Sequence, residues 1–257
     1  MKPVVAHLWR VAALLAICTL ALQLTFAARI VLMNLIDPQS TTFQRSEAWR
    51  LLTEGRLAWS QAWVDYAQIS VALKRAVIAS EDAAFVGHGG IDWESLEKAW
   101  GKNQRAEQRA EKRAEQTAQR QTKAAAGNTR PAIEPKVVGG STITQQLAKN
   151  LFLSGERTVL RKGQEFVITL MLEALLSKQR ILEIYLNNVE WGEGVFGAQA
   201  AALHYFRVDS GRLGPDAAAR LAVMLPAPKR FEKRPGSAYV SGRAATIVAR
   251  MGAVELP

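Results

Sequence analysis

The chain has 257 residues, enough for one full-sized domain with an appendage, and 49% of them are hydrophobic. This fraction excludes a wholly disordered chain, and the single cysteine, Cys18, excludes an intramolecular disulfide and a thiolate zinc cage. Lysine and arginine number 33 against 23 acidic residues. The formal net charge of +10 favours anionic partners: nucleic acid, acidic lipid surfaces or phosphorylated substrates.

The N-terminal segment predicts a membrane anchor. Residues 11–28 carry no charge, and as a helix they would measure about 27 Å, close to the hydrocarbon thickness of a bilayer. Apolar residues continue to Ile36, so we expect a tail at 1–10 and an anchor at 11–36. A cleaved signal peptide is the alternative, but the run is longer than the usual apolar region of such a peptide.

The short tail carries Lys2 and Arg10, which favour its retention in the cytoplasm. The chain after the anchor then lies on the far side of the membrane, with a single span. Such an exported domain is not expected to bind nucleic acid.

Residues 43–100 are expected to form helices. Apolar residues recur at helical spacing in 69–84 and again in 91–100, where Asp92 can cap the start. Residues 101–136 differ, because they hold nine basic and four acidic residues with almost no large apolar side chain. We interpret this segment as a solvated, mobile insertion; a tether to an anionic surface is the alternative.

The C-terminal half predicts further helices. Their expected ranges are 141–152, 158–177, 178–188, 198–206, 214–225 and 243–251. Three prolines between 226 and 235 mark an irregular segment. Because the alternation of β-branched residues is nearly absent, we expect a mainly α domain.

A first cluster of chemically capable residues follows the predicted helix 69–84. Glu81 and Asp82 are adjacent carboxylates, and His88 and two glycines come shortly after. Neighbouring carboxylates repel and burial raises the pKa of a carboxyl group, so Glu81 could act as a general acid or base. Solvated surface carboxylates and a structural histidine are the alternative.

A second cluster begins at Gly139 and Gly140. Ser141, Gln145 and Lys149 are four residues apart, so one helical face would offer a hydroxyl, an amide and an ammonium to a phosphate or sugar. The alternative is an ordinary helix start that needs only Ser141 or Thr142 as its cap.

A third cluster lies around Glu165, in an otherwise apolar helix whose start carries Arg157, Arg161 and Lys162. These cations suit an anionic leaving group. A helical salt bridge between Arg161 and Glu165, four residues apart, is the alternative. Glu81 and Glu165 together supply the two carboxylates typical of chemistry at a sugar anomeric centre.

Four segments resemble family 51 glycosyltransferases, the bacterial peptidoglycan glycosyltransferases, and they occur in the order of that family. The segments are EDAAFVGHGG (81–90), GGSTITQQLAKN (139–150), RTVLRKGQE (157–165) and KQRILEIYLNNVEWGEGVFGAQAAALHYF (178–206). The resemblance covers residues 43–252 and does not extend to the transpeptidase half of bifunctional relatives. It implies a mainly α, lysozyme-like glycosyltransferase domain behind an N-terminal transmembrane helix. The insertion at 101–136 departs from the family, where the link is shorter.

The resemblance implies polymerisation of lipid II onto a nascent glycan strand. Glu81 would be the base and Asp82 would tune it, while Lys149, Arg157 and Ser141 would hold the donor. Glu165 would assist departure of the pyrophosphate or hold Mg²⁺ or Mn²⁺. Further candidates for substrate binding are Thr142, Gln145, Gln146, Arg161 and Lys162.

The resemblance also implies partners among cell-wall synthases or the divisome. Two other functions remain open at this stage: a glycan-cleaving lytic transglycosylase or lysozyme-like enzyme, and a non-catalytic membrane scaffold. A cleaving enzyme would not need the cations proposed to bind pyrophosphate, and a scaffold would tolerate the loss of the Glu81 carboxylate.

Overall fold

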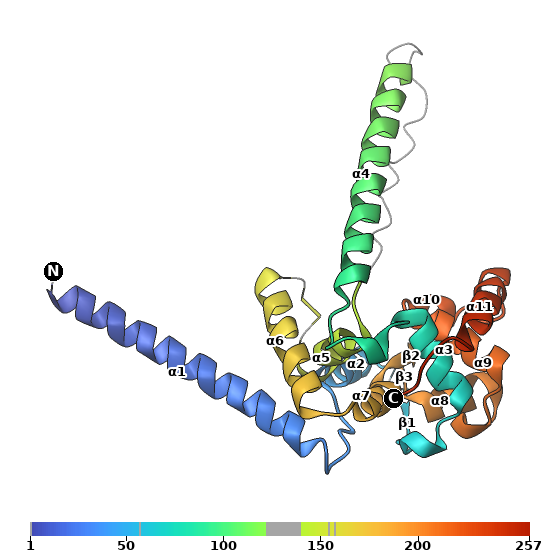
Figure 1. The fold of residues 1–257 in the computed structure, drawn as a ribbon, viewed down its shortest axis with the longest axis horizontal. Coiled ribbons are helices and arrows are strands. Elements are labelled where there is room, and N and C mark those ends of the chain that lie inside the picture. Colours follow the sequence, from blue (N-terminus) through green and yellow to red (C-terminus); the bar gives the residue numbers. More distant parts are fainter. Residues whose placement is uncertain (1, 57, 122–139, 154, 157) are drawn as a thin grey trace. The chain divides into compact units, whose positions relative to one another are not determined.

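The computed structural model describes residues 2–56, 58–121, 140–153, 155–156 and 158–257 (Figure 1). Helices dominate these residues. They are α1 (Lys2–Leu32), α2 (Thr42–Thr53), α3 (Val71–Glu81), α4 (Trp93–Gln121), α5 (Ile143–Phe152), α6 (Val159–Leu175), α7 (Lys178–Asn188), α8 (Ala198–Phe206), α9 (Pro215–Met224), α10 (Pro228–Phe231) and α11 (Ala238–Met251). The prediction of a mainly α protein is confirmed.

The chain divides into two compact units. The larger comprises Met1–Gly90 and Thr142–Pro257, and the smaller comprises Ile91–Ser141. The larger unit contains every described helix except α4.

Hydroxyl side chains begin most helices of the larger unit, because they accept hydrogen bonds from backbone N–H groups that have no partner within the helix. The capping residues with this geometry are Thr41, Ser70, Thr142, Thr158, Ser177 and Ser237. Helices α2 and α5 have reciprocal capping boxes, in which Gln44 and Gln145 return a bond to the cap. Helix boundaries therefore follow short polar signals in the sequence.

The core of the larger unit surrounds α7. Its apolar face and Tyr185 are fully buried, and Trp191, just after the helix, is also fully buried. Helix α3 packs on α9 and α11, while α5 packs on α6 and α7. These two groups of helices position the polar residues described below.

A small sheet interrupts the helices, and the sequence did not predict it. Strand β1 (Ser60–Gln61) runs parallel to β3 (Val195–Phe196), which pairs antiparallel with β2 (Glu190–Gly192). Gly194 has φ of +71°, and a Cβ there would lie 1.9 Å from the carbonyl oxygen of Ala58. Only glycine permits this close crossing.

The N-terminal helix confirms the predicted long apolar helix. Residues Val4–Leu32 have a length and a mean hydropathy, 2.2 in the best window, that suit a membrane span. Its boundaries differ from the expected 11–36, because the helix begins at Lys2 and residues beyond Leu32 form turns. Where the bilayer begins and ends along it stays a prediction.

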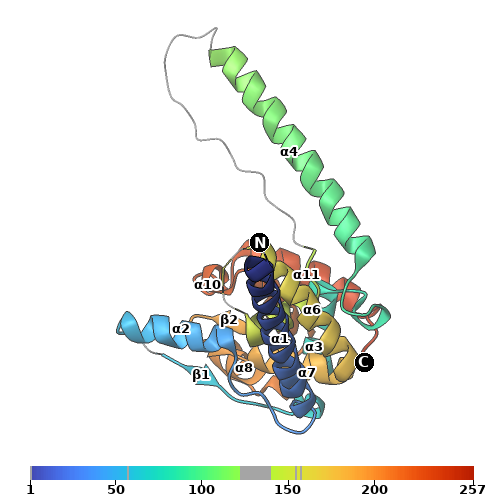
Figure 2. The same ribbon diagram turned by 90° about the vertical axis from the view of Figure 1, so that its left-hand side faces the viewer.

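The C-terminal third of α1 packs beside α6 (Figures 1 and 2). Ile30 is fully buried there. The ring of Phe26 meets that of Phe152 edge-on at 5.3 Å, and the side-chain amides of Gln23 and Gln164 exchange hydrogen bonds of 2.9 and 3.0 Å. The apolar helix thus continues directly into the packed unit.

The smaller unit meets one expectation about helix boundaries and departs from another. The cap predicted at Asp92 is present, since its carboxylate accepts the backbone N–H of Ser95 at 2.8 Å. The helix expected to end at residue 100 continues to Gln121, because residues 101–121 are rich in strong helix formers. Residues 122–136 lie outside the described residues, and the mobility of the 101–136 insertion stays a prediction.

One expected helical region is different. Residues 54–70 were included in the helical stretch 43–100, but their described part holds strand β1 and one 3-10 turn, Tyr66–Gln68. Gly55, with φ of +65°, follows the end of α2 and breaks the helical pattern.

Candidate active site

Glu81 is the last residue of α3, and its carboxylate is held from two sides. The side-chain amide of Gln146, on α5, donates to Oε2 at 2.9 Å, and the Ser80 hydroxyl donates to Oε1 at 3.4 Å. Burial raises the pKa of Glu81 above its ordinary value, the two hydrogen bonds oppose this, and neighbouring Asp82 adds to it. Both causes that the sequence suggested for a raised pKa of Glu81, burial and an adjacent carboxylate, are therefore present.

Asp82 links α3 to the start of α5. Its Oδ1 lies 2.8 Å from Nε2 of His88, and its Oδ2 accepts the backbone N–H of Ile143 at 3.0 Å. Nδ1 of His88 accepts the N–H of Gly90, so the ring proton is on Nε2. This N–H donates a hydrogen bond to Oδ1 of Asp82. Burial raises the pKa of Asp82, and the bond from His88 opposes that shift. These contacts fix Asp82 beside Glu81. His88 therefore has a structural role, one of the possibilities that the sequence left open, because it holds the Asp82 carboxylate in place.

Thr142 and Gln145 form the cap of α5. The Thr142 hydroxyl accepts the Gln145 N–H at 3.2 Å and donates to the carbonyl oxygen of Gly90 at 2.6 Å. The Gln145 side chain accepts the N–H of Thr142. Both predicted substrate-binding side chains thus hold the helix start in place, and contact with substrate stays a prediction for them.

Gln146 joins Glu81 to a buried tyrosine. Its amide oxygen accepts the hydroxyl of Tyr185, on α7, at 2.9 Å, while its amide nitrogen donates to Glu81. This fixes which end of the amide faces the carboxylate. Burial raises the pKa of Tyr185 well above its ordinary value, with Glu81 and Asp82 contributing, so the hydroxyl remains a donor. Tyr185, Gln146 and Glu81 form one chain of hydrogen bonds.

Lys149 is an exposed residue of α5. It follows Gln146 by three residues, which places it on the same side of the helix as the amide that contacts Glu81. Ser141 lies before the first residue of α5 and belongs to the smaller unit, so the expected helical face of Ser141, Gln145 and Lys149 is not formed. Arg157 lies outside the described residues.

The third cluster is a compact ion-pair group on α6. Glu165 is 3% exposed, and its Oε2 pairs with Nη1 of Arg161 at 2.9 Å while its Oε1 pairs with Lys162. The salt bridge that the sequence offered as the alternative is therefore present. Among the described residues, no hydrogen bond or ion pair joins this group to Glu81, so each of the two carboxylates has its own polar partners.

A divalent cation fits the described residues poorly. Both oxygens of Glu165 already face cationic side chains, and the described part of the chain has no group of three or more acidic, histidine or cysteine residues suited to a metal. Mg²⁺ and Mn²⁺ require several oxygen ligands. A metal requirement stays a prediction.

A network of polar contacts around Glu173 supports the site, and the sequence did not predict it. Oε1 of Glu173 accepts the Thr144 hydroxyl at 2.5 Å and pairs with Lys178 at 2.8 Å, joining α5, α6 and α7. Gly90, with φ of +84°, packs on Glu173, and a Cβ there would lie 2.7 Å from its Cγ. The loop that follows Asp82 is thus pressed against the helices that carry the rest of the site.

The assembled group can accept a proton. It offers a half-buried carboxylate with a raised pKa, a fixed amide donor and a cation on the same helix face. A carboxylate of this kind is suited to general base catalysis near neutral pH, and the cations suit a substrate with negative charge.

Comparison with known proteins agrees with these features. The model of a family described as Transglycosylase matches residues 50–114 and 117–252. The chain is 47% identical over 246 residues to a biosynthetic peptidoglycan transglycosylase of Paraburkholderia phytofirmans, covering 95% of this chain and 91% of that protein. It is 50% identical over 239 residues to the protein of that name from Burkholderia vietnamiensis, covering 93% and 86% respectively. The matched domain is a lysozyme-like glycosyltransferase, and the expected fold class is confirmed.

Proposed function

The chain belongs to the transglycosylase family and is a peptidoglycan glycosyltransferase of cell-wall biosynthesis, and from this premise we propose that it polymerises lipid II. Lipid II is a disaccharide-pentapeptide carried on a polyprenyl pyrophosphate. Its GlcNAc 4-hydroxyl would attack the MurNAc anomeric carbon of the growing strand. The product would be a β-1,4-linked glycan strand.

The proposed reaction exchanges one bond at the anomeric carbon for another. The oxygen of the acceptor hydroxyl forms a bond to the anomeric carbon, and the bond from that carbon to the pyrophosphate oxygen breaks. The pyrophosphate leaves with the bonding electron pair, and the hydroxyl proton passes to Glu81. Attack on the face opposite the α-linked pyrophosphate inverts the centre and gives the β linkage.

One observation carries the proposal: the carboxylate of Glu81 is held in a defined direction at the end of α3. Burial raises its pKa, and Gln146 fixes Oε2 from 2.9 Å. A carboxylate whose pKa is raised by burial accepts a proton more readily than a solvated one. Asp82, held by His88 and α5, acts as a positioning residue beside it.

The cations would stabilise the leaving pyrophosphate. Lys149 would do so from α5, with Arg157 and Ser141 as the further donor contacts implied by the family. Arg161 and Lys162 both pair with Glu165. This pairing supports a role for the Glu165 carboxylate in holding the two cations in place for the pyrophosphate.

The membrane completes the proposal. Helix α1 would cross the inner membrane once, with the short tail in the cytoplasm and the catalytic domain in the periplasm. Because lipid II lies in the same bilayer, the anchor would raise the effective concentration of substrate at the site. Partners among cell-wall synthases and the divisome stay a prediction.

The full chain should be incubated with labelled lipid II in one arm and with purified sacculi in another. We expect glycan polymer and free polyprenyl pyrophosphate from lipid II, and no soluble fragments from sacculi. Soluble glycan fragments from sacculi without polymer from lipid II would identify the cleaving enzyme instead. If neither polymer nor soluble fragments form, the result would favour a non-catalytic membrane scaffold.

A further inference from the structure

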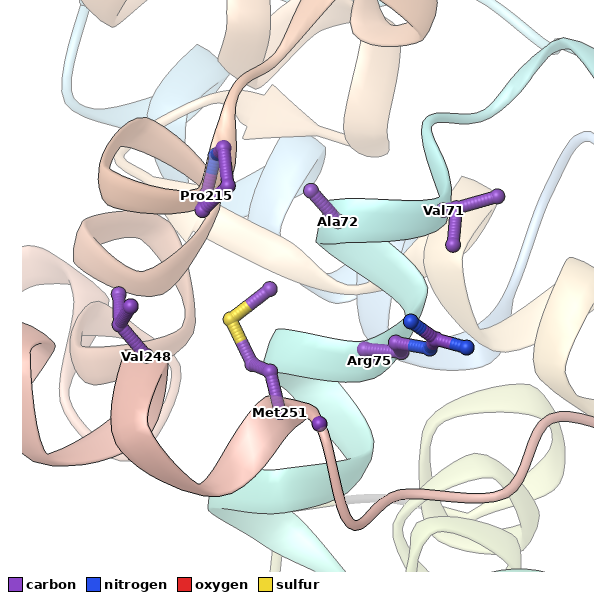
Figure 3. Close-up of a pocket in the computed structure, with 7 residues that line it drawn as sticks. Val71, Ala72, Arg75, Pro215, Val248 and Met251 are labelled. Carbon is purple, nitrogen blue, oxygen red and sulfur yellow. The ribbon is translucent and has the colours of Figure 1, made fainter.

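A pocket with a volume of about 360 Å³ lies where α3, α9 and α11 meet (Figure 3). It is open to solvent, and its volume is at the lower end of the range for small-ligand sites. Its lining residues are Val71, Ala72, Arg75, Pro215, Val248, Met251 and Gly252. We call it the α3–α9–α11 pocket.

The walls of this pocket are apolar. Val71 on α3 is 53% exposed, and Val248 on α11 is 38% exposed. Figure 3 shows Val248 and Pro215 on one side, Val71 and Arg75 on the other, and Met251 between them. An apolar group placed here would remove this surface from water, which is favourable.

Arg75 is the charged residue of the lining. Its Nε is buried without a hydrogen-bond partner, and the described part of the chain shows no ion pair for its guanidinium. The Nε atoms of Arg161 and Arg220 are likewise buried without a partner, but the guanidinium of Arg161 pairs with Glu165, and that of Arg220 donates to the carbonyl oxygen of Pro235. A buried donor without a partner is unfavourable, and a carboxylate supplies two acceptors that match a guanidinium.

We propose that the α3–α9–α11 pocket binds the C-terminal residue of a partner polypeptide, with its apolar side chain between Val71 and Val248 and its carboxylate on Arg75. The open side leaves room for the rest of the partner chain. Pro257 makes a contact away from this pocket, because its carbonyl oxygen accepts the hydroxyl of Tyr66 at 3.3 Å.

The pocket is separate from the candidate active site. Arg75 precedes Glu81 by six residues on α3, about 9 Å of helix rise, and the lining does not include any residue proposed for catalysis. The inference therefore does not rest on the proposed function, and Arg75 variants should retain glycan polymerisation.

The test uses the full chain in lipid nanodiscs, with ¹³C-methyl-labelled methionines and Met251→Leu to assign the pocket signal. The probes are N-acetyl-L-phenylalanine and N-acetyl-L-phenylalaninamide, which share the apolar ring and differ in the carboxylate. We expect the acid to shift the Met251 signal saturably at millimolar concentration, and the amide to bind about tenfold more weakly. Arg75→Gln should weaken acid binding about tenfold, while Arg243→Gln, which removes an exposed cation outside the lining, should not.

Several results would overturn the proposal. These are an unshifted Met251 signal, equal affinities for acid and amide, or equal losses in the two arginine variants. If Arg75→Gln fails to fold, Val248→Asp decides, because it places a repelling carboxylate on an exposed wall position. Unchanged binding of the acid to Val248→Asp would then contradict the proposal, and its loss would support it.

Discussion

Replacing Gln146 with leucine should shift the pH dependence of catalysis. Gln146 donates to Glu81 at 2.9 Å and accepts from Tyr185 at 2.9 Å, so the substitution removes both contacts and introduces an apolar side chain of similar size. The hydrogen bond to Glu81 lowers the pKa of this buried carboxyl, against the larger effect of burial. Its loss therefore raises that pKa further.

The magnitude follows from the hydrogen bond. A bond to a charged group contributes about 1.5–3 kcal/mol, and 1.36 kcal/mol corresponds to about one pKa unit. The acidic limb of the rate profile should therefore move up by about 1–2 pH units in Gln146→Leu. The buried Tyr185 hydroxyl would lose its acceptor, which should cost about 1–3 kcal/mol of stability.

A double variant separates these two effects. Gln146→Leu with Tyr185→Phe removes the unpaired hydroxyl and should recover most of the lost stability, but the acidic limb should stay shifted. The assay is kcat/KM for lipid II polymerisation across pH, together with urea unfolding of each variant. An acidic limb at the wild-type position in Gln146→Leu, or one that returns with Tyr185→Phe, would refute the reasoning.

Three further predictions concern other parts of the chain. Lys149→Ala should lose most polymerisation through poorer stabilisation of the pyrophosphate, and Lys149→Arg should retain more; equal rates for wild type and Lys149→Ala would make this lysine structural. Burial raises the pKa of Glu190 to about 7 from an ordinary 4.5, so the folded state binds its proton more tightly. Stability should fall by up to about 3 kcal/mol as pH rises through that window, and urea unfolding of Glu190→Gln at pH 5 and 8 should show this dependence reduced. Deleting residues 105–130 should leave the polymerisation rate nearly unchanged, and a collapse would show that the segment is functional.

The sequence predicted the helices best where a polar cap and an apolar face coincide. Helices α7 and α8 match their predicted ranges at both ends. Helix α4 runs past its expected end because residues 101–121 have helix propensity without the apolar stripe on which the prediction relied. The sheet was not predicted, since strands of two or three residues are too short to show alternation.

The candidate site was predicted in its parts but not in its connections. Glu81, Asp82 and Gln146 were named from the sequence, and the structure brings them together. Tyr185 and Glu173 were not, because they lie in helices whose pattern indicates core packing. Nothing in the local sequence reveals that Tyr185 orients the amide of Gln146 through a contact across 39 positions.

The most direct test of the account is lipid II polymerisation by Glu81→Gln, with Glu255→Gln as a control that removes an exposed carboxylate near the C-terminus. Glutamine retains the size of the side chain, but its amide cannot take up the proton of the GlcNAc 4-hydroxyl as a carboxylate does. We predict that Glu81→Gln folds, with stability equal to or above that of the wild type because burial disfavours the charged form, and forms no glycan polymer. Polymer formation by folded Glu81→Gln at a rate near that of Glu255→Gln would contradict the account.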